Sequence, residues 1–97
     1  CVPAVIPAGL YPFVTADVPT VMTVESLVVR PGVSDDVVYQ VCASIFNHVD
    51  LLAAAHPSAA GSLTPEDIAS AVALAHSNNQ PYHPGALRYY RDRGWID

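Results

Sequence analysis

Apolar residues recur at helical spacing through the middle of the chain. Between residues 37 and 52 they follow one another at steps of one, three and four, which is typical of one wide apolar helix face. Ser34 suits the N-cap, and Asp35 and Asp36 place negative charge in the first turn. Because Pro57 cannot continue a helix, the pattern predicts one helix that ends near residue 56. The predicted apolar face consists of Val37, Val38, Val41, Cys42, Ile45, Phe46, Val49 and Leu52.

Two more helices are predicted in the second half of the chain. Thr64 suits an N-cap, and Asp67 is placed to bond back toward it in a weaker form of the capping box. The helix that follows runs through an alanine-rich stretch. A third helix is predicted to begin at Pro84, with His83 as part of its cap, and to stop at Gly94.

The N-terminal third is predicted to be extended. Residues 2–11 favour a strand interrupted by prolines, and residues 19–30 are rich in Val and Thr, with a bulge expected near Glu25. Two strands alone are marginal in water, so the sheet should be larger than this chain supplies. The predicted fold class is α/β, with two extended segments followed by three helices in a single domain over residues 1–97.

The composition indicates unusually abundant apolar surface. Hydrophobic residues make up 52% of the chain and charged residues 13%, whereas globular chains average about 25% charged residues. Since a small domain buries a smaller fraction of its surface than a large one, part of this surface should meet a missing part of the protein, a second copy or a partner. The net charge is -5, which argues against nucleic-acid binding despite Arg88, Arg91 and Arg93 near the end.

No arrangement of residues predicts an enzyme, a metal site or a cofactor. The four histidines form no pair at the i, i+4 spacing of metal ligands, and no nucleophile motif is present. Cys1 and Cys42 permit one disulfide, but Cys42 is expected to be a buried free thiol. The chain begins at Cys1, which is interpreted as the start of a processed product or fragment, or alternatively as a lipidated residue.

Several segments, in order, resemble one family of transport proteins. The segments "IPAGLYP", "DVPTV", "LVV", "DDVVYQV", "IFNHVDLLAAAHPSA", "LTPEDI" and "YHPGALRYYRDRGW" are similar to the C-terminal part of the TAXI group of TRAP-transporter solute-binding proteins. The resemblance covers nearly all of the chain. Leu10 and Phe13 depart from the family pattern, which usually has a threonine and a small residue at these positions.

The resemblance implies the C-terminal portion of an extracytoplasmic, two-lobe periplasmic receptor. Such a receptor captures a small organic anion, such as a dicarboxylate or an amino acid, and delivers it to the membrane permease subunits. The resemblance places Tyr11 on a loop near the cleft between the lobes, and Thr20 on the following strand. Both are candidate ligand-binding residues, although a core tyrosine that closes a turn and a threonine chosen for strand propensity are the alternatives.

A different function class also fits the composition. The low charge and the apolar extended segments suit a small interaction module that associates with itself. A swapped or intertwined homodimer would complete the sheet of an isolated fragment.

Overall fold

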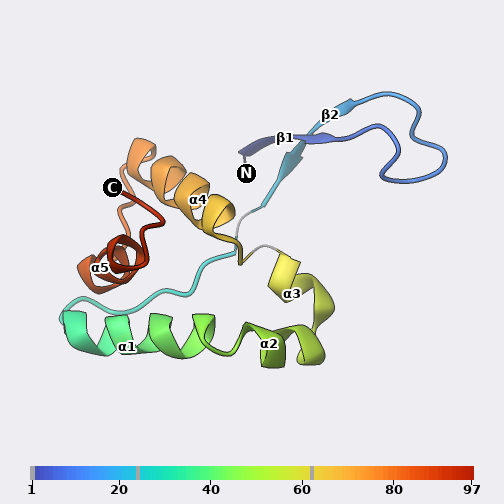
Figure 1. The fold of residues 1–97 in the computed structure, drawn as a ribbon. Coiled ribbons are helices and arrows are strands. Elements are labelled where there is room, and N and C mark those ends of the chain that lie inside the picture. Colours follow the sequence, from blue (N-terminus) through green and yellow to red (C-terminus); the bar gives the residue numbers. More distant parts are fainter. Residues whose placement is uncertain (1, 24, 62) are drawn as a thin grey trace.

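A β-hairpin projects from a group of packed helices (Figure 1). The computed structural model of the chain describes residues 2–23, 25–61 and 63–97, so the interpretations of Cys1 and the pattern at Val24 lie outside the described residues. The radius of gyration is 15.5 Å, whereas about 13 Å is typical of a compact domain of 100 residues. The elements are β1 (Val2–Ile6), β2 (Val18–Met22), α1 (Asp35–Phe46), α2 (Val49–Ala55), α3 (Pro57–Gly61), α4 (Pro65–Ser77) and α5 (Pro84–Asp92).

The two strands pair in antiparallel fashion, with Val2 opposite Met22 and Ile6 opposite Val18. A hydrogen-bonded pair needs an N–H from both residues, and proline has none. Pro3, opposite Val21, and Pro19, opposite Val5, therefore occupy the non-hydrogen-bonded pairs. In such pairs the main-chain N–H and C=O groups point away from the partner strand, to the outer edge of the hairpin. Pro3 therefore removes one N–H donor from the outer edge of β1, and Pro19 removes one from the outer edge of β2.

The second extended segment is shorter than predicted. The strand prediction over residues 19–30 is wrong beyond Met22, and residues 25–30 form no regular structure. A strand needs a partner for its main-chain groups, and the described chain offers none to this segment. Leu27 and Val28 are 76% and 83% exposed. β1 likewise ends at Ile6, before the loop that was expected to continue the strand to residue 11.

The predicted helix over residues 34–56 is broken. α1 ends at Phe46, and α2 begins at Val49 with an axis bent by 62° from that of α1. Asn47 caps α1, and the Nδ1 of His48 lies 2.7 Å from the carbonyl oxygen of Ser44. The apolar spacing continues across this break, which is why the pattern did not reveal it. Pro57 does end α2, but it also starts the short helix α3, so the prediction of three helices is wrong.

The predicted helix caps are confirmed. The hydroxyl oxygen of Ser34 accepts a hydrogen bond from the Val37 N–H at 3.3 Å. The Thr64 hydroxyl oxygen accepts one from the Asp67 N–H at 3.2 Å, and the same hydroxyl donates to the Asp67 carboxylate at 2.9 Å. The cap of α5 is the His83 side chain, which accepts from the Gly85 N–H. Each cap satisfies an amide that the helix itself leaves without a partner.

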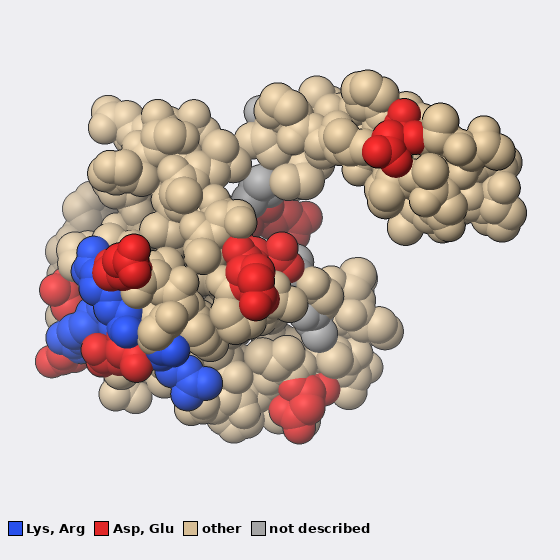
Figure 2. Space-filling view, turned by 45° about the horizontal axis from the view of Figure 1, so that its top comes forward, with Lys and Arg blue, Asp and Glu red and all other residues tan. Residues whose placement is uncertain are grey.

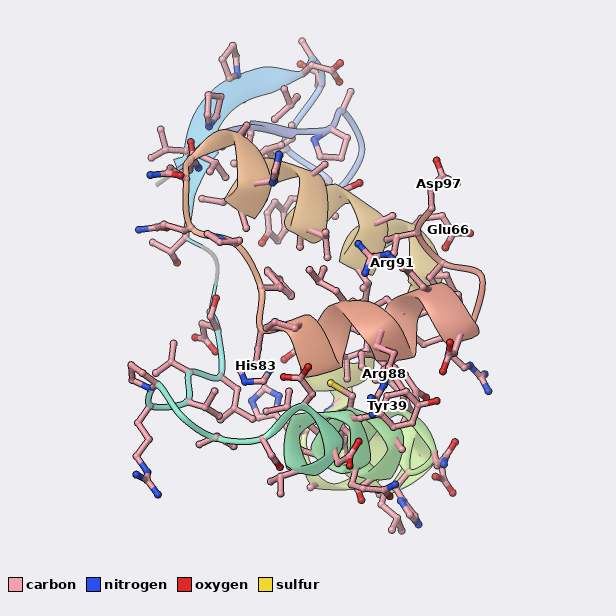
Figure 3. The ribbon with its side chains drawn as sticks, turned by 90° about the vertical axis from the view of Figure 1, so that its left-hand side faces the viewer. Tyr39, Glu66, His83, Arg88, Arg91 and Asp97 are labelled. Carbon is pink, nitrogen blue, oxygen red and sulfur yellow. The ribbon has the colours of Figure 1, made fainter. Side chains whose placement is uncertain are left out.

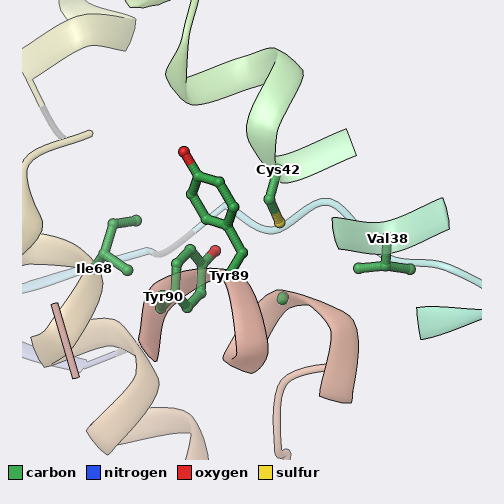
Figure 4. Packing of buried hydrophobic residues seen from close by; sticks show 6 residues of the cluster. Val38, Cys42, Ile68, Tyr89 and Tyr90 are labelled. Carbon is green, nitrogen blue, oxygen red and sulfur yellow. The ribbon is translucent and has the colours of Figure 1, made fainter. Parts of the chain in front are cut away.

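The buried core lies where α1, α4 and α5 meet, and two tyrosines of α5 fill its centre (Figure 4). Tyr89 stacks on Phe46 with ring centroids 5.7 Å apart, and Trp95 lies edge-on to both at 5.0 Å and 5.9 Å. The hydroxyl of Tyr89 is buried and has no hydrogen-bond partner among the described residues. The buried residues of this cluster are Val38, Cys42, Ile68, Ala86, Tyr89 and Tyr90.

Only part of the predicted apolar face of residues 37–52 is buried. Val38 and Cys42 face α5, whereas Val37 and Val41 remain 54% and 38% exposed. An open groove lined by α1 residues runs along this outer face, with a volume of about 490 Å³. The described chain has no element to cover it, so the width of the apolar face exceeds what α5 can bury.

The N-termini of α1 and α5 are held together by one histidine. The Nε2 of His83 lies 2.8 Å from the carbonyl oxygen of Val33, and its Nδ1 accepts from the Gly85 N–H at 3.0 Å. These contacts assign the proton of the neutral ring to Nε2. Gly85 lies directly on the main chain of Asp35, where a side chain would collide with the Asp35 carbonyl oxygen. The glycine therefore sets how closely the two helices approach.

Candidate ligand-contact site

The loop between β1 and β2 carries Tyr11, the first predicted ligand residue. The Val14 N–H donates to the carbonyl oxygen of Tyr11 at 3.0 Å, which closes a turn over Pro12 and Phe13. The Gly9 N–H donates back across the loop to Val14 at 2.8 Å, and Gly9 has a φ of 87° that suits glycine. The loop therefore has a defined shape built from its own main chain.

Tyr11 lies outside the core formed by the described residues. It is 51% exposed, and its ring stacks on that of Phe13 with centroids 5.6 Å apart and planes inclined by 5°. Phe13 is itself 81% exposed. The aromatic surface therefore consists of two rings and not one, which the sequence interpretation missed. The sequence did contain a signal for the second ring, because Phe13 stands close to Tyr11 at a position where the family pattern usually has a small residue.

Thr20, the second predicted ligand residue, lies on β2 opposite Ala4 and is exposed. Two further pairs, Val5 with Pro19 and Ile6 with Val18, separate it from the loop. Because paired residues point to the same side of a sheet, Thr20 shares its face with Val2 and Ile6. The structure thus puts the two predicted ligand residues on one hairpin without bringing them into contact.

Arg88 and Arg93 contact acidic or aromatic neighbours. Arg88 donates to the Asp36 carboxylate at 2.9 Å and lies 4.6 Å from the centre of the Tyr39 ring. Arg93 lies 5.4 Å from the centre of the Trp95 ring. Figure 2 shows the basic side chains of this view interspersed with acidic ones and not as a continuous basic face, and Figure 3 shows Arg88 beside Tyr39. A surface of this kind does not match the phosphate backbone of a nucleic acid.

A second groove lies between α4, α5 and the C-terminal residues. It has a volume of about 450 Å³ and is lined mainly by apolar side chains, with His76 and Arg91 as its basic members. The Nε of Arg91 donates to the main-chain oxygen of Asp97 at 3.1 Å. This contact engages one of the five N–H donors of the Arg91 guanidinium.

The buried titratable groups do not provide a nucleophile. Burial raises the pKa of the Cys42 thiol above its ordinary value of 9.0, although a hydrogen bond with Tyr90 opposes this shift. The thiol is free, as predicted, and stays protonated at neutral pH. Burial likewise raises the pKa of Tyr90 and, more weakly, that of Tyr82. Within the described residues, no group of three His, Cys, Asp or Glu side chains is placed to hold a metal ion.

Among the described residues, no single helix is long and apolar enough to cross a membrane. α1 and α2 taken together reach the required length and composition, but they are bent by 62°.

Comparison with known proteins gives one family match. Residues 1–94 match the NMT1-like family, a family of periplasmic binding-type proteins that are typically extracytoplasmic and generally non-enzymatic. No curated protein and no solved structure matches the chain. Because the match covers almost the whole sequence, the chain belongs to the NMT1-like family.

Proposed function

We propose that this chain is the C-terminal portion of the solute-binding subunit of a TRAP-type transporter. In this proposal the complete receptor has two lobes, works outside the cytoplasmic membrane and captures a small organic anion such as a dicarboxylate or an amino acid. It then delivers the anion to the membrane permease subunits. The observation that carries the proposal is the family match over residues 1–94, together with the ordered segments that resemble the TAXI group.

The exposed apolar surface supports a larger parent structure. The accessible surface is 7159 Å², whereas a compact monomer of 10.3 kDa has about 5,400 Å². On the hairpin, every residue of β2 is exposed. Both faces of the hairpin are apolar, as in sheets that are covered on both sides. The rest of a receptor lobe would supply that cover.

Tyr11 and Thr20 are the proposed ligand-binding residues. Tyr11 offers a ring face and a hydroxyl on a loop of defined shape, and Thr20 offers a hydroxyl on the adjoining strand. In the two-lobe receptor this hairpin would border the cleft.

The experiment is thermal unfolding of the full-length protein that contains this chain, with a panel of dicarboxylates and amino acids. A ligand present at 100 times its Kd stabilises the folded state by about 2.7 kcal/mol, which is readily measured. Thr20→Val should weaken that stabilisation, whereas Thr15→Val, an exposed threonine in the hairpin loop, should not. An unchanged melting temperature with every compound would contradict the receptor assignment.

A self-associating module is the second candidate function. The excess accessible surface exceeds the roughly 800 Å² that each partner buries in a standard interface. Two copies packed through their hairpins would meet little like charge, because Asp17 is the single charged residue of residues 2–23. Sedimentation of this 97-residue chain distinguishes the candidates, since a monomer with one cooperative melt would count against the module.

A further inference from the structure

The imidazole ring of His83 uses both of its nitrogens at the place where two helices begin. Its Nε2–H donates to the carbonyl oxygen of Val33, just before α1, and its Nδ1 accepts from the Gly85 N–H in the first turn of α5. Figure 3 shows the ring between α5 and α1. The side chain is only 20% exposed. Because one nitrogen donates and the other accepts, this arrangement needs the neutral ring.

The ring cannot take up a second proton and keep both bonds. An imidazolium carries an N–H on each nitrogen, so a proton on Nδ1 would face the Gly85 N–H, whose nitrogen is 3.0 Å away. Gly85 has no room to shift toward α1, since it lies directly on the main chain of Asp35. The ring would therefore have to turn away, or the first turn of α5 would have to leave α1.

Two acidic residues and one basic residue carry the charge around the ring. The Oδ1 of Asp35 on α1 lies 3.9 Å from Nδ1, and this side chain is 56% exposed. The neighbouring Asp36 is held by Arg88 of α5 at 2.9 Å. An ion pair with an exposed carboxylate stabilises little, and the N-terminal ends of two helices disfavour a positive charge. Asp35 therefore does not offset the loss of the cap when the ring is protonated.

We propose that His83 is a pH-sensitive switch, in which the neutral ring holds the start of α5 against α1 and proton uptake at Nδ1 releases it. Histidine changes charge between about pH 5 and 8, so the contact is made at neutral pH and lost in mild acid. The unfolded chain takes up the same proton without losing a cap. It therefore binds more protons than the folded chain in this range, and stability falls as the pH falls.

The release is local and does not depend on the proposed solute-binding function. The aromatic core around Tyr89 begins one turn further along α5 than Gly85. That core has no part in the proton uptake and keeps the rest of α5 in place. Proton uptake by His83 thus changes the order of the first turn of α5 and leaves the remainder of the helix packed.

The test is amide hydrogen exchange in the full-length protein at about pH 7.5 and about pH 5.0. Protection of residues 85–87 is expressed relative to the exchange rate of an unstructured chain at the same pH. It should fall at least about fivefold in acid, which is the effect of losing one cap. His83→Asn caps the helix without taking up a proton, so its protection should change less than about twofold. The matched control is His76→Asn, an exposed histidine of α4, which should respond as the wild type does.

Two further measurements decide the result even if the asparagine variant does not fold. Nitrogen NMR of wild-type protein with labelled histidine should show a ring with its proton on Nε2 at about pH 7.5, and this ring should gain its second proton as residues 85–87 lose protection. Asp35→Asn should lose at least as much protection as the wild type. The switch is disproved if His83 gains its proton while residues 85–87 stay protected, or if His83→Asn responds as the wild type does. It is equally disproved if Asp35→Asn abolishes the response, because Asp35 and not the cap would then control it.

Discussion

The hairpin and the helical part of this chain use similar residues in opposite ways. The helical part buries aromatic rings between α1, α4 and α5, with Tyr89 4% exposed at the centre. The hairpin exposes its aromatic rings, with Phe13 81% exposed at the tip. Both regions are apolar, so composition does not explain the difference. What differs is whether the described chain contains a second layer to pack against.

Because only the helical part has a buried core, we expect it to supply most of the stability, and we expect the exposed hairpin to serve in contacts with other surfaces. The helical part has a core of its own and should determine how the chain unfolds. The hairpin contributes main-chain pairing between two strands, which is marginal in water without further cover. Mutations in the two regions should therefore have unequal effects on the free energy of unfolding.

The largest expected contrast is between Tyr89→Ala and Val21→Ala. Loss of the Tyr89 ring from the core should lower the free energy of unfolding by about 3–5 kcal/mol, as for other buried aromatic rings. Val21 on the hairpin is 66% exposed, and its truncation should change stability by at most about 0.5 kcal/mol. Urea denaturation of both variants measures the two values, and equal losses would break the distinction between the regions.

A second contrast tests the close approach of α1 and α5. Gly85→Ala should lower stability by about 1–3 kcal/mol, because the added methyl group collides with the Asp35 main chain. Gly61→Ala is the matched control, since no atom lies within 4 Å of the added methyl group there. Because Gly61 is the exposed last residue of α3, that variant should change stability by at most about 0.5 kcal/mol. A neutral Gly85→Ala would show that the two helices are free to separate.

The His83 cap should have a smaller effect. His83→Ala removes the acceptor for the Gly85 N–H and the long-range bond to Val33, and should cost about 1–2 kcal/mol. His83→Asn retains a capping side chain without the reach to Val33, so it should recover part of the loss. Thermal melts at neutral pH compare the three proteins, and an Asn variant as unstable as the Ala variant would contradict the capping role.

The unpaired hydroxyl in the core predicts a gain in stability. Tyr89→Phe removes a buried hydroxyl that has no partner among the described residues, so stability should rise by about 1 kcal/mol. Tyr90→Phe instead removes a hydroxyl whose interaction with the Cys42 thiol contributes to the raised pKa of Tyr90, and it should be destabilising by up to about 1 kcal/mol. Opposite signs in parallel denaturation curves support this assignment. A loss in both variants would show that the Tyr89 hydroxyl has a partner.

Tyr90 should make the stability of the fold depend on pH at alkaline pH but not near neutrality. Burial raises the pKa of Tyr90 above its ordinary value of 10.0, so the folded state keeps a proton that the unfolded chain releases. The resulting contribution to stability is complete below pH 10 and is lost as the pH rises further. Melting temperatures between pH 8 and 11 should fall less steeply for Tyr90→Phe than for the wild type. Parallel slopes would contradict this assignment.

The local signals in the sequence were the reliable ones. Ser34, Thr64 and His83 cap their helices because each cap is decided within a few residues. The break at Asn47 and His48 was not predicted, since the apolar spacing continues through it. The strand over residues 25–30 was predicted wrongly because Val and Leu favour a strand only where a partner strand exists. The stacking of Phe13 on Tyr11 was not predicted, because it depends on the geometry of the loop between β1 and β2.

The prolines at the hairpin edges bear on how this chain behaves at high concentration. Within the strands, Pro3 and Pro19 leave one outward N–H on each edge, from Val5 and Val21. Growth of a cross-β fibril needs a continuous row of donors and acceptors along the strand. The exposed side chains should therefore drive clusters of limited size, and the chain should precipitate as amorphous material that does not seed further growth.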